Sequence, residues 1–79
     1  MRIEILGTGC TKCQALASNA EEAARKLGVS YELCKVTSLK EIMQRGVMLT
    51  PAIAVDGRVL MQGKVLSDFE IRDLLIRAQ

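Results

Sequence analysis

The chain of 79 residues has no histidine and no tryptophan, and its only aromatic side chains are those of Tyr31 and Phe69. Without histidine it cannot build a Cys–His catalytic pair or a histidine metal site, which excludes many classes of enzyme. It has no basic cluster with interspersed aromatic residues on which bases could stack, and its net charge is only +2. We therefore expect an aliphatic core and no nucleic-acid partner.

The chain also lacks an apolar run close to the roughly 18 residues that a membrane-spanning helix needs, and its N-terminus shows no signal-peptide pattern. Its three cysteines are an odd number, unlike the disulfide framework of a small secreted protein. These absences predict a cytoplasmic protein with no membrane partner. The length and an apolar fraction of 49% predict one folded domain, residues 1–79, and we expect it to be a monomer.

Hydrophobic periodicity and turn residues predict seven helices and strands along the chain. Capping boxes at Ser38/Glu41 and Ser67/Glu70 each predict the start of a helix, and Asp56-Gly57 predicts a hairpin turn. The expected elements are a strand at residues 2–6, a helix running to Leu27 with its apolar stripe from Cys13, a strand at 29–36, a short helix from Ser38 to Gly46, strands at 52–55 and 58–61, and a helix after Ser67. This β-α-β-α-β-β-α order predicts an α/β fold, in which a four-stranded mixed sheet is flanked by three helices.

Methionine and leucine side chains are expected to complete the aliphatic core. We expect Leu39, Ile42 and Met43 to form the inner side of the short helix. Met43, Met48 and Met61 are interpreted as core-filling residues in a domain almost without aromatic rings.

The feature richest in chemical information is Cys10-Thr11-Lys12-Cys13, which lies between the first strand and the first helix. The first sulfur is then at a helix N-terminus, where unpaired N–H groups and the helix dipole stabilise a thiolate. Cys13 falls on the apolar stripe of the helix, so an accessible sulfur is paired with a sheltered one. Lys12 adds positive charge beside Cys10 and is expected to help lower the pKa of its thiol. This arrangement is typical of a dithiol redox site.

Two motifs in register, Gly7-Thr8-Gly9-Cys10-Thr11-Lys12-Cys13 and Gly46-Val47-Met48-Leu49-Thr50-Pro51-Ala52, make the chain resemble the thioredoxin superfamily. They are similar above all to the small thioredoxin-like, "redox-active disulfide" proteins of bacteria and archaea. The resemblance covers essentially the whole chain and implies a thioredoxin-like fold. It also implies that the Thr50–Pro51 peptide bond is cis and faces the cysteine pair.

The same resemblance implies a thiol–disulfide oxidoreductase. Cys10 would attack a substrate disulfide, Cys13 would resolve the mixed disulfide, and Thr50 and Pro51 would bind the substrate. The redox group would be the Cys10–Cys13 disulfide, with no further cofactor and no metal. The expected partners are proteins that contain disulfides and a reductant, either a thioredoxin reductase-like protein or another dithiol donor.

Other interpretations remain open at this point. The same cysteine pair could serve a copper-binding module or chaperone, although such domains have a βαββαβ order. Cys34 is interpreted as an incidental strand residue rather than a third redox thiol. Glu4 could accept a proton near Cys13, or it could simply be a partly exposed carboxylate.

Overall fold

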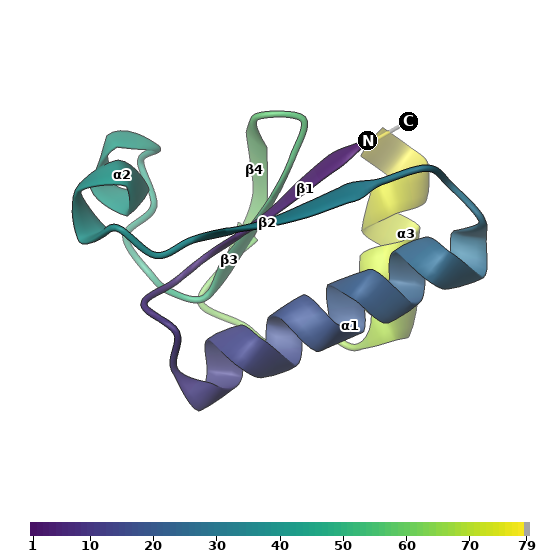
Figure 1. Cartoon of the computed structure of the whole chain (residues 1–79), viewed down its shortest axis with the longest axis horizontal. Helices are drawn as coiled ribbons and strands as arrows, with labels where there is room; N and C mark the ends of the chain where they lie inside the picture. The colour runs from purple at the N-terminus through teal and green to yellow at the C-terminus, as the bar shows by residue number, and fades with distance from the viewer. Residues whose placement is uncertain (79) are drawn as a thin grey trace.

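The computed structural model describes residues 1–78, so Gln79, the last residue of the predicted domain, lies outside the described residues. Its elements are β1 (Arg2–Leu6), α1 (Thr11–Leu27), β2 (Glu32–Val36), α2 (Leu39–Gln44), β3 (Ala52–Val55), β4 (Arg58–Gln62) and α3 (Asp68–Ala78) (Figure 1). The predicted α/β class and element order are confirmed. The second strand is shorter than predicted, because residues 29–31 do not join the sheet.

The four strands form one mixed sheet in the order β2-β1-β3-β4. β1 and β2 are parallel and are connected through α1, whereas β3 runs antiparallel to both β1 and β4. The hairpin between β3 and β4 turns at Asp56 and Gly57, which both have positive φ, as the sequence predicted. β1 and β3 are therefore the central strands, and the cysteine motif follows one of them directly.

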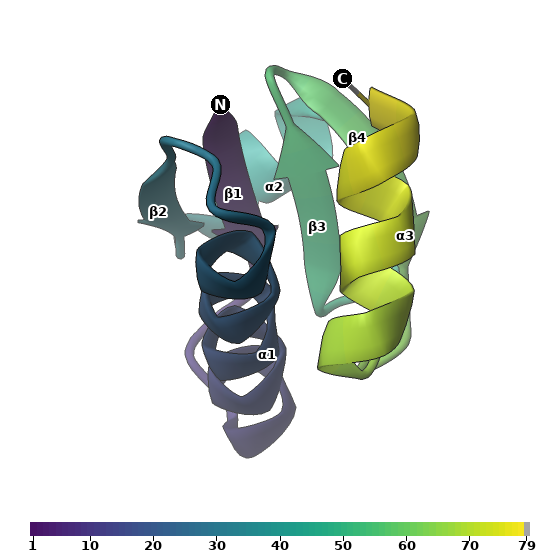
Figure 2. The same ribbon diagram turned by 90° about the vertical axis from the view of Figure 1, so that its right-hand side faces the viewer.

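The helices divide between the two faces of the sheet (Figure 2). α1 and α3 cover one face, and α2 lies on the other. Ile3 and Ile5 of β1 point towards α1 and α3, and Leu6 belongs to the cluster on the α2 side. We call these the α1/α3 face and the α2 face.

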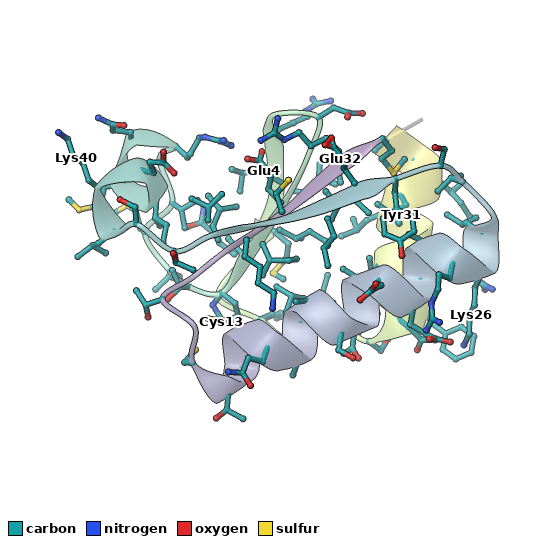
Figure 3. All side chains as sticks on the ribbon, viewed as in Figure 1. Glu4, Cys13, Lys26, Tyr31, Glu32 and Lys40 are labelled. Atoms are coloured by element: carbon teal, nitrogen blue, oxygen red, sulfur yellow. The ribbon has the colours of Figure 1, made fainter. Side chains whose placement is uncertain are left out.

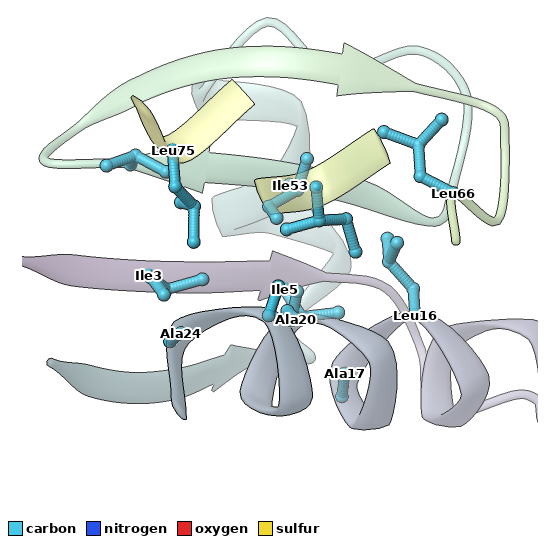
Figure 4. Close-up of a cluster of buried hydrophobic side chains, with 12 residues drawn as sticks. Ile3, Ile5, Leu16, Ala17, Ala20, Ala24, Ile53, Leu66 and Leu75 are labelled. Atoms are coloured by element: carbon cyan, nitrogen blue, oxygen red, sulfur yellow. The ribbon is translucent and has the colours of Figure 1, made fainter. Parts of the chain in front are cut away.

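The main core lies on the α1/α3 face (Figure 4). It is closed by small residues of α1 that let the helix approach the sheet, and by an N-terminal cap on α3. The Ser67 side chain accepts a hydrogen bond from the Glu70 N–H, and the Glu70 side chain accepts one from the Ser67 N–H. The buried residues of this core are Ile3, Ile5, Leu16, Ala17, Ala20, Ala23, Ala24, Ile53, Val55, Leu66, Ile71 and Leu75.

The α2 face has a smaller apolar cluster of Leu6, Val36, Ile42, Val47, Ala52 and Ala54. Here two predictions were wrong. Of the three residues expected on the inner side of α2, only Ile42 is buried, because a helix of six residues buries little more than one side chain against the sheet. Met43 and Met48 are 66% and 89% exposed, so neither fills the core, whereas Met61 does pack against the α1/α3 core.

β4 contains one extra residue relative to β3. Ile53 lies opposite Met61 and Ala54 lies opposite Val59, which leaves Leu60 without a partner in the register. A bulge of this kind shifts the alternation of side chains by one position. Leu60 and Met61 therefore both pack against the α1/α3 core, and Gln62 lies opposite Ala52, a residue of the α2-face cluster.

Among the helices of residues 1–78, none has the length and apolar character that crossing a membrane requires.

Candidate active site

The cysteine pair lies at the N-terminus of α1, and Figure 3 labels Cys13 there. Cys10 is the N-cap residue, with extended backbone (φ −69°, ψ 169°), and its carbonyl accepts the Gln14 N–H at 3.0 Å. Cys13 lies in the first turn and is 4% exposed, whereas Cys10 is open to solvent. The separation into an exposed and a sheltered sulfur that the sequence predicted is present in the structure.

The two sulfur atoms are unbonded and lie 2.8 Å apart. A hydrogen bond from the Cys13 thiol, followed by backbone N–H groups of the first helical turn, holds the pKa of Cys10 below its usual value. Burial raises the pKa of Cys13, and its hydrogen bond to Cys10 adds to this. The pair is thus prepared for a thiolate on Cys10 and a proton on Cys13.

Lys12 contributes to this arrangement through its main chain. Its backbone N–H is one of the groups that lower the pKa of Cys10, and its ammonium group is not among them. The first turn of α1 also contains no acidic residue that would oppose a negative charge at Cys10.

Gly7 provides the space in which the Cys13 sulfur lies, and the sequence analysis missed this. A Cβ atom on Gly7 would overlap Cys13 Sγ, and the same position is 3.8 Å from Pro51 Cα. Gly7 is also fixed by its own N–H, which donates to the Val36 carbonyl at 2.9 Å. The only sequence signal was a glycine directly after a strand and before the cysteines.

The Thr50–Pro51 peptide bond is cis, as predicted. Pro51 is buried and Thr50 is exposed. Because Gly7 lies close to both Pro51 and Cys13, the proline is on the same side of the β1 end as the cysteine pair, and the expected juxtaposition is confirmed. Thr50, which is exposed, therefore directly precedes a proline that lies near the cysteine pair.

Both readings of Glu4 were wrong. Its side chain is buried, and both of its carboxylate oxygens accept hydrogen bonds from Arg45, at 2.9 and 2.6 Å. These hydrogen bonds hold the pKa of Glu4 below its usual value. Side chains alternate along β1, so Glu4 points away from α1 and Cys13 (Figure 3), and it is Ile5 that lines a small hollow with Cys13. Glu4 and Arg45 are 41 positions apart, so the sequence around Glu4 did not indicate this ion pair.

Cys34 lies opposite Glu4 in the register of β1 and β2 and is half-buried. Within residues 1–78, no group of three or more His, Cys, Asp or Glu side chains could hold a metal ion. The observed element order also differs from the βαββαβ order expected of copper-carrying domains.

A family model described as "Thioredoxin domain" matches residues 1–76. The chain belongs to the thioredoxin family. The thioredoxin of Methanothermobacter thermautotrophicus is 41% identical over 75 residues, which cover 95% of this chain and 97% of that protein. The thioredoxin of Methanocaldococcus jannaschii is 40% identical over 73 residues, covering 92% of this chain and 84% of that protein.

Membership of the thioredoxin family confirms the resemblance that the two sequence motifs indicated, and with it the thioredoxin-like fold. The protein is a thiol–disulfide oxidoreductase. Its cysteine pair and cis-proline loop are brought together at the end of β1.

Proposed function

We propose that this thioredoxin-family protein reduces protein disulfides, with Cys10 attacking and Cys13 resolving. The Cys10 thiolate attacks one sulfur of the substrate disulfide, forming a mixed disulfide and releasing the other sulfur as a thiolate. Cys13 then loses its proton and attacks Cys10 Sγ, which releases the second substrate thiol and leaves a Cys10–Cys13 disulfide. Two electrons have passed to the substrate. The observation that carries this assignment is the exposed, acidified Cys10 beside the buried, less acidic Cys13.

Thr50 and Pro51 are proposed to bind the substrate. Among residues 1–78, neither the N–H nor the C=O of Thr50 has a hydrogen-bond partner within the protein. Both groups can therefore pair with the extended main chain on one side of the substrate cysteine. Pro51 is buried next to them and holds this part of the chain against the sheet.

Lys12 is proposed to tune the Cys10 thiolate, through its backbone N–H more than through its charge. Lys12→Met keeps the N–H and removes the charge, so the pH at which Cys10 becomes reactive to iodoacetamide should hardly change. A clear rise in that pH would assign the tuning to the ammonium group instead.

We further propose that residues 1–79 act as one monomeric domain in the cytoplasm. The reductant would be a thioredoxin reductase-like protein or another dithiol donor, and the redox group would be the cysteine pair itself, without a bound cofactor. The close sulfur pair supports the redox group, and membership of the thioredoxin family supports the kind of reductant. The location is supported by the absence of a membrane-spanning helix among the described residues.

Trapping of mixed disulfides tests the order of attack. Cys13→Ser should accumulate a mixed disulfide between Cys10 and a disulfide-bonded peptide, because attack proceeds and resolution does not. Cys10→Ser should trap far less, and Cys34→Ser is the matched control that should behave like the unmodified protein. Equal trapping by the Cys10→Ser and Cys13→Ser variants would contradict the assignment.

A further inference from the structure

The segment that leads into the cis-proline is held by the end of β4. The side-chain oxygen of Gln62 accepts two backbone hydrogen bonds, from the Met48 N–H at 2.8 Å and from the Leu49 N–H at 3.2 Å. The next residue, Gly63, donates its own N–H to the Pro51 carbonyl at 2.9 Å. These three hydrogen bonds, made by two consecutive residues, thus fix the main chain on both sides of Thr50.

Thr50 is the residue that these contacts leave free. Its neighbours on the N-terminal side are bound to Gln62, its neighbour on the C-terminal side is bound to Gly63, and its own N–H and C=O point to no partner among residues 1–78. Met48 and Leu49 are 89% and 61% exposed, so apolar burial contributes little to holding them. The polar contacts of Gln62 restrain the main chain of both residues, and the Leu49 side chain also lies against Gly63.

The bulge in β4 gives Gln62 its position. Simple alternation from Val59, which packs on the α2 face, would place residue 62 on the α1/α3 face. The extra residue reverses this, so that Gln62 lies opposite Ala52 and its side chain reaches the segment before Pro51.

We propose that Gln62 is a positioning residue for substrate binding: it holds the Met48 and Leu49 N–H groups so that the main chain of Thr50 is presented in one fixed conformation. Gln62 does not touch the reacting sulfurs. It acts by restraining the loop before the substrate binds. The entropy cost of ordering the loop on binding is then smaller. The proposal rests on the proposed use of Thr50 as a substrate-binding residue.

The experiment compares Gln62→Met with Gln62→Glu. Methionine matches the length of glutamine but cannot accept the two hydrogen bonds, whereas the glutamate carboxylate can. Arg58 is exposed at the other end of β4, so Arg58→Met controls for the effect of placing a methionine in this strand. The substrates are a synthetic disulfide-bonded peptide with several residues on each side of its cysteines, and the small disulfide 5,5′-dithiobis(2-nitrobenzoic acid), which offers no main chain to pair with Thr50.

Gln62→Met should raise KM for the peptide about three- to tenfold, the effect expected from losing one or two hydrogen bonds, with little change in the rate towards the small disulfide. In the same variant, amide hydrogen exchange at Met48 and Leu49 should become faster. Gln62→Glu should restore both readouts, and Arg58→Met should leave both unchanged.

The proposal is overturned if Gln62→Met keeps slow exchange at Met48 and Leu49, or if exchange becomes fast while KM for the peptide stays the same. Failure of Gln62→Glu to restore either readout also counts against it. Fast exchange with an unchanged KM would contradict the use of Thr50 for substrate binding, whereas disulfide reduction by Cys10→Ser would contradict the proposed roles of the cysteines. Amide exchange reports on the Gln62 contacts whether or not the protein turns over.

Discussion

The two faces of the sheet are stabilised in different ways. On the α1/α3 face, two long helices close a cluster of twelve buried apolar residues. On the α2 face, one helix of six residues covers a cluster of six, beside a buried glutamate that is paired with an arginine. Apolar packing therefore fixes the helix that bears the cysteines, while polar contacts fix the loop that bears Thr50. The redox site lies at Gly7, where the two regions meet.

The largest effect is expected from opening the core on the α1/α3 face. Ile71→Ala should lower the free energy of unfolding by about 2–5 kcal/mol, because Ile71 is fully buried between α3 and the sheet and the cavity cannot collapse completely. Urea denaturation measures the loss. Ile42→Ala is the matched change on the α2 face, and it should cost less because the short helix can move to fill the space. An equal or larger loss at Ile42 would remove the contrast between the faces.

Gly7→Ala tests the junction of the two regions. The added methyl group would occupy the space of Cys13 Sγ, so we expect a loss of about 1–3 kcal/mol from overpacking. Displacing Cys13 also weakens its hydrogen bond to Cys10, so the pKa of Cys10 should rise towards that of an ordinary thiol. The pH dependence of alkylation by iodoacetamide measures this shift. Thr8→Ala, at the neighbouring exposed position, should leave it unchanged, and an unchanged profile in Gly7→Ala would show that the sulfur does not need that space.

Arg45→Met removes the partner of the buried Glu4 carboxylate. In the unmodified protein the pKa of Glu4 is lower when folded than when unfolded. The ion pair therefore contributes stability above the unfolded pKa of about 4.3, and that contribution is lost as the pH falls through the folded pKa. Without Arg45, burial raises the pKa of Glu4, so the variant should be destabilised most at pH 7 and progressively less towards pH 4.

Urea denaturation at pH 7, 5 and 4 measures this trend. Arg2→Met is the control, because Arg2 is exposed and its closest approach to the Glu4 carboxylate is 4.0 Å. A destabilisation by Arg45→Met that is the same at all three pH values would show that Glu4 does not depend on Arg45 for its charge.

The smallest effect is expected at the exposed methionine of α2. Met43→Gln should change the free energy of unfolding by no more than about 0.5 kcal/mol, because the side chain is already 66% exposed. The same substitution at Met61, which packs against the α1/α3 core, should be clearly destabilising. Urea denaturation of both variants sharpens the comparison, and similar losses at the two positions would contradict it.

The contrast between the faces also marks how much the sequence could predict. Periodicity along α1 and the reciprocal cap at Ser67 and Glu70 are local signals, and signals of this kind predicted the helices, the order of the elements along the chain and the exposed and sheltered cysteines correctly. For α2 the same periodicity failed, because burial of Met43 depends on whether a neighbouring element covers that side of the helix.

The remaining features depend on contacts between residues far apart in the chain. Glu4 and Arg45 are 41 positions apart, and Gln62 is 14 positions from Met48. The space for the Cys13 sulfur requires a glycine at a position whose neighbours are known only from the fold. The cis-proline was predicted only because a family resemblance supplied the long-range information that periodicity lacks.

The extra residue in β4 gives that strand one residue to spare. Deleting Leu60 would remove the bulge and leave a regular strand, in which Met61 still lies opposite Ile53 and Gln62 still lies opposite Ala52. Deleting Leu60 and Met61 together would instead bring Gln62 opposite Ile53, so that its side chain would point into the aliphatic core. The double deletion would thus disconnect the loop before Pro51 without altering any residue of the site. Single deletions in this strand should consequently be tolerated, and double deletions should not.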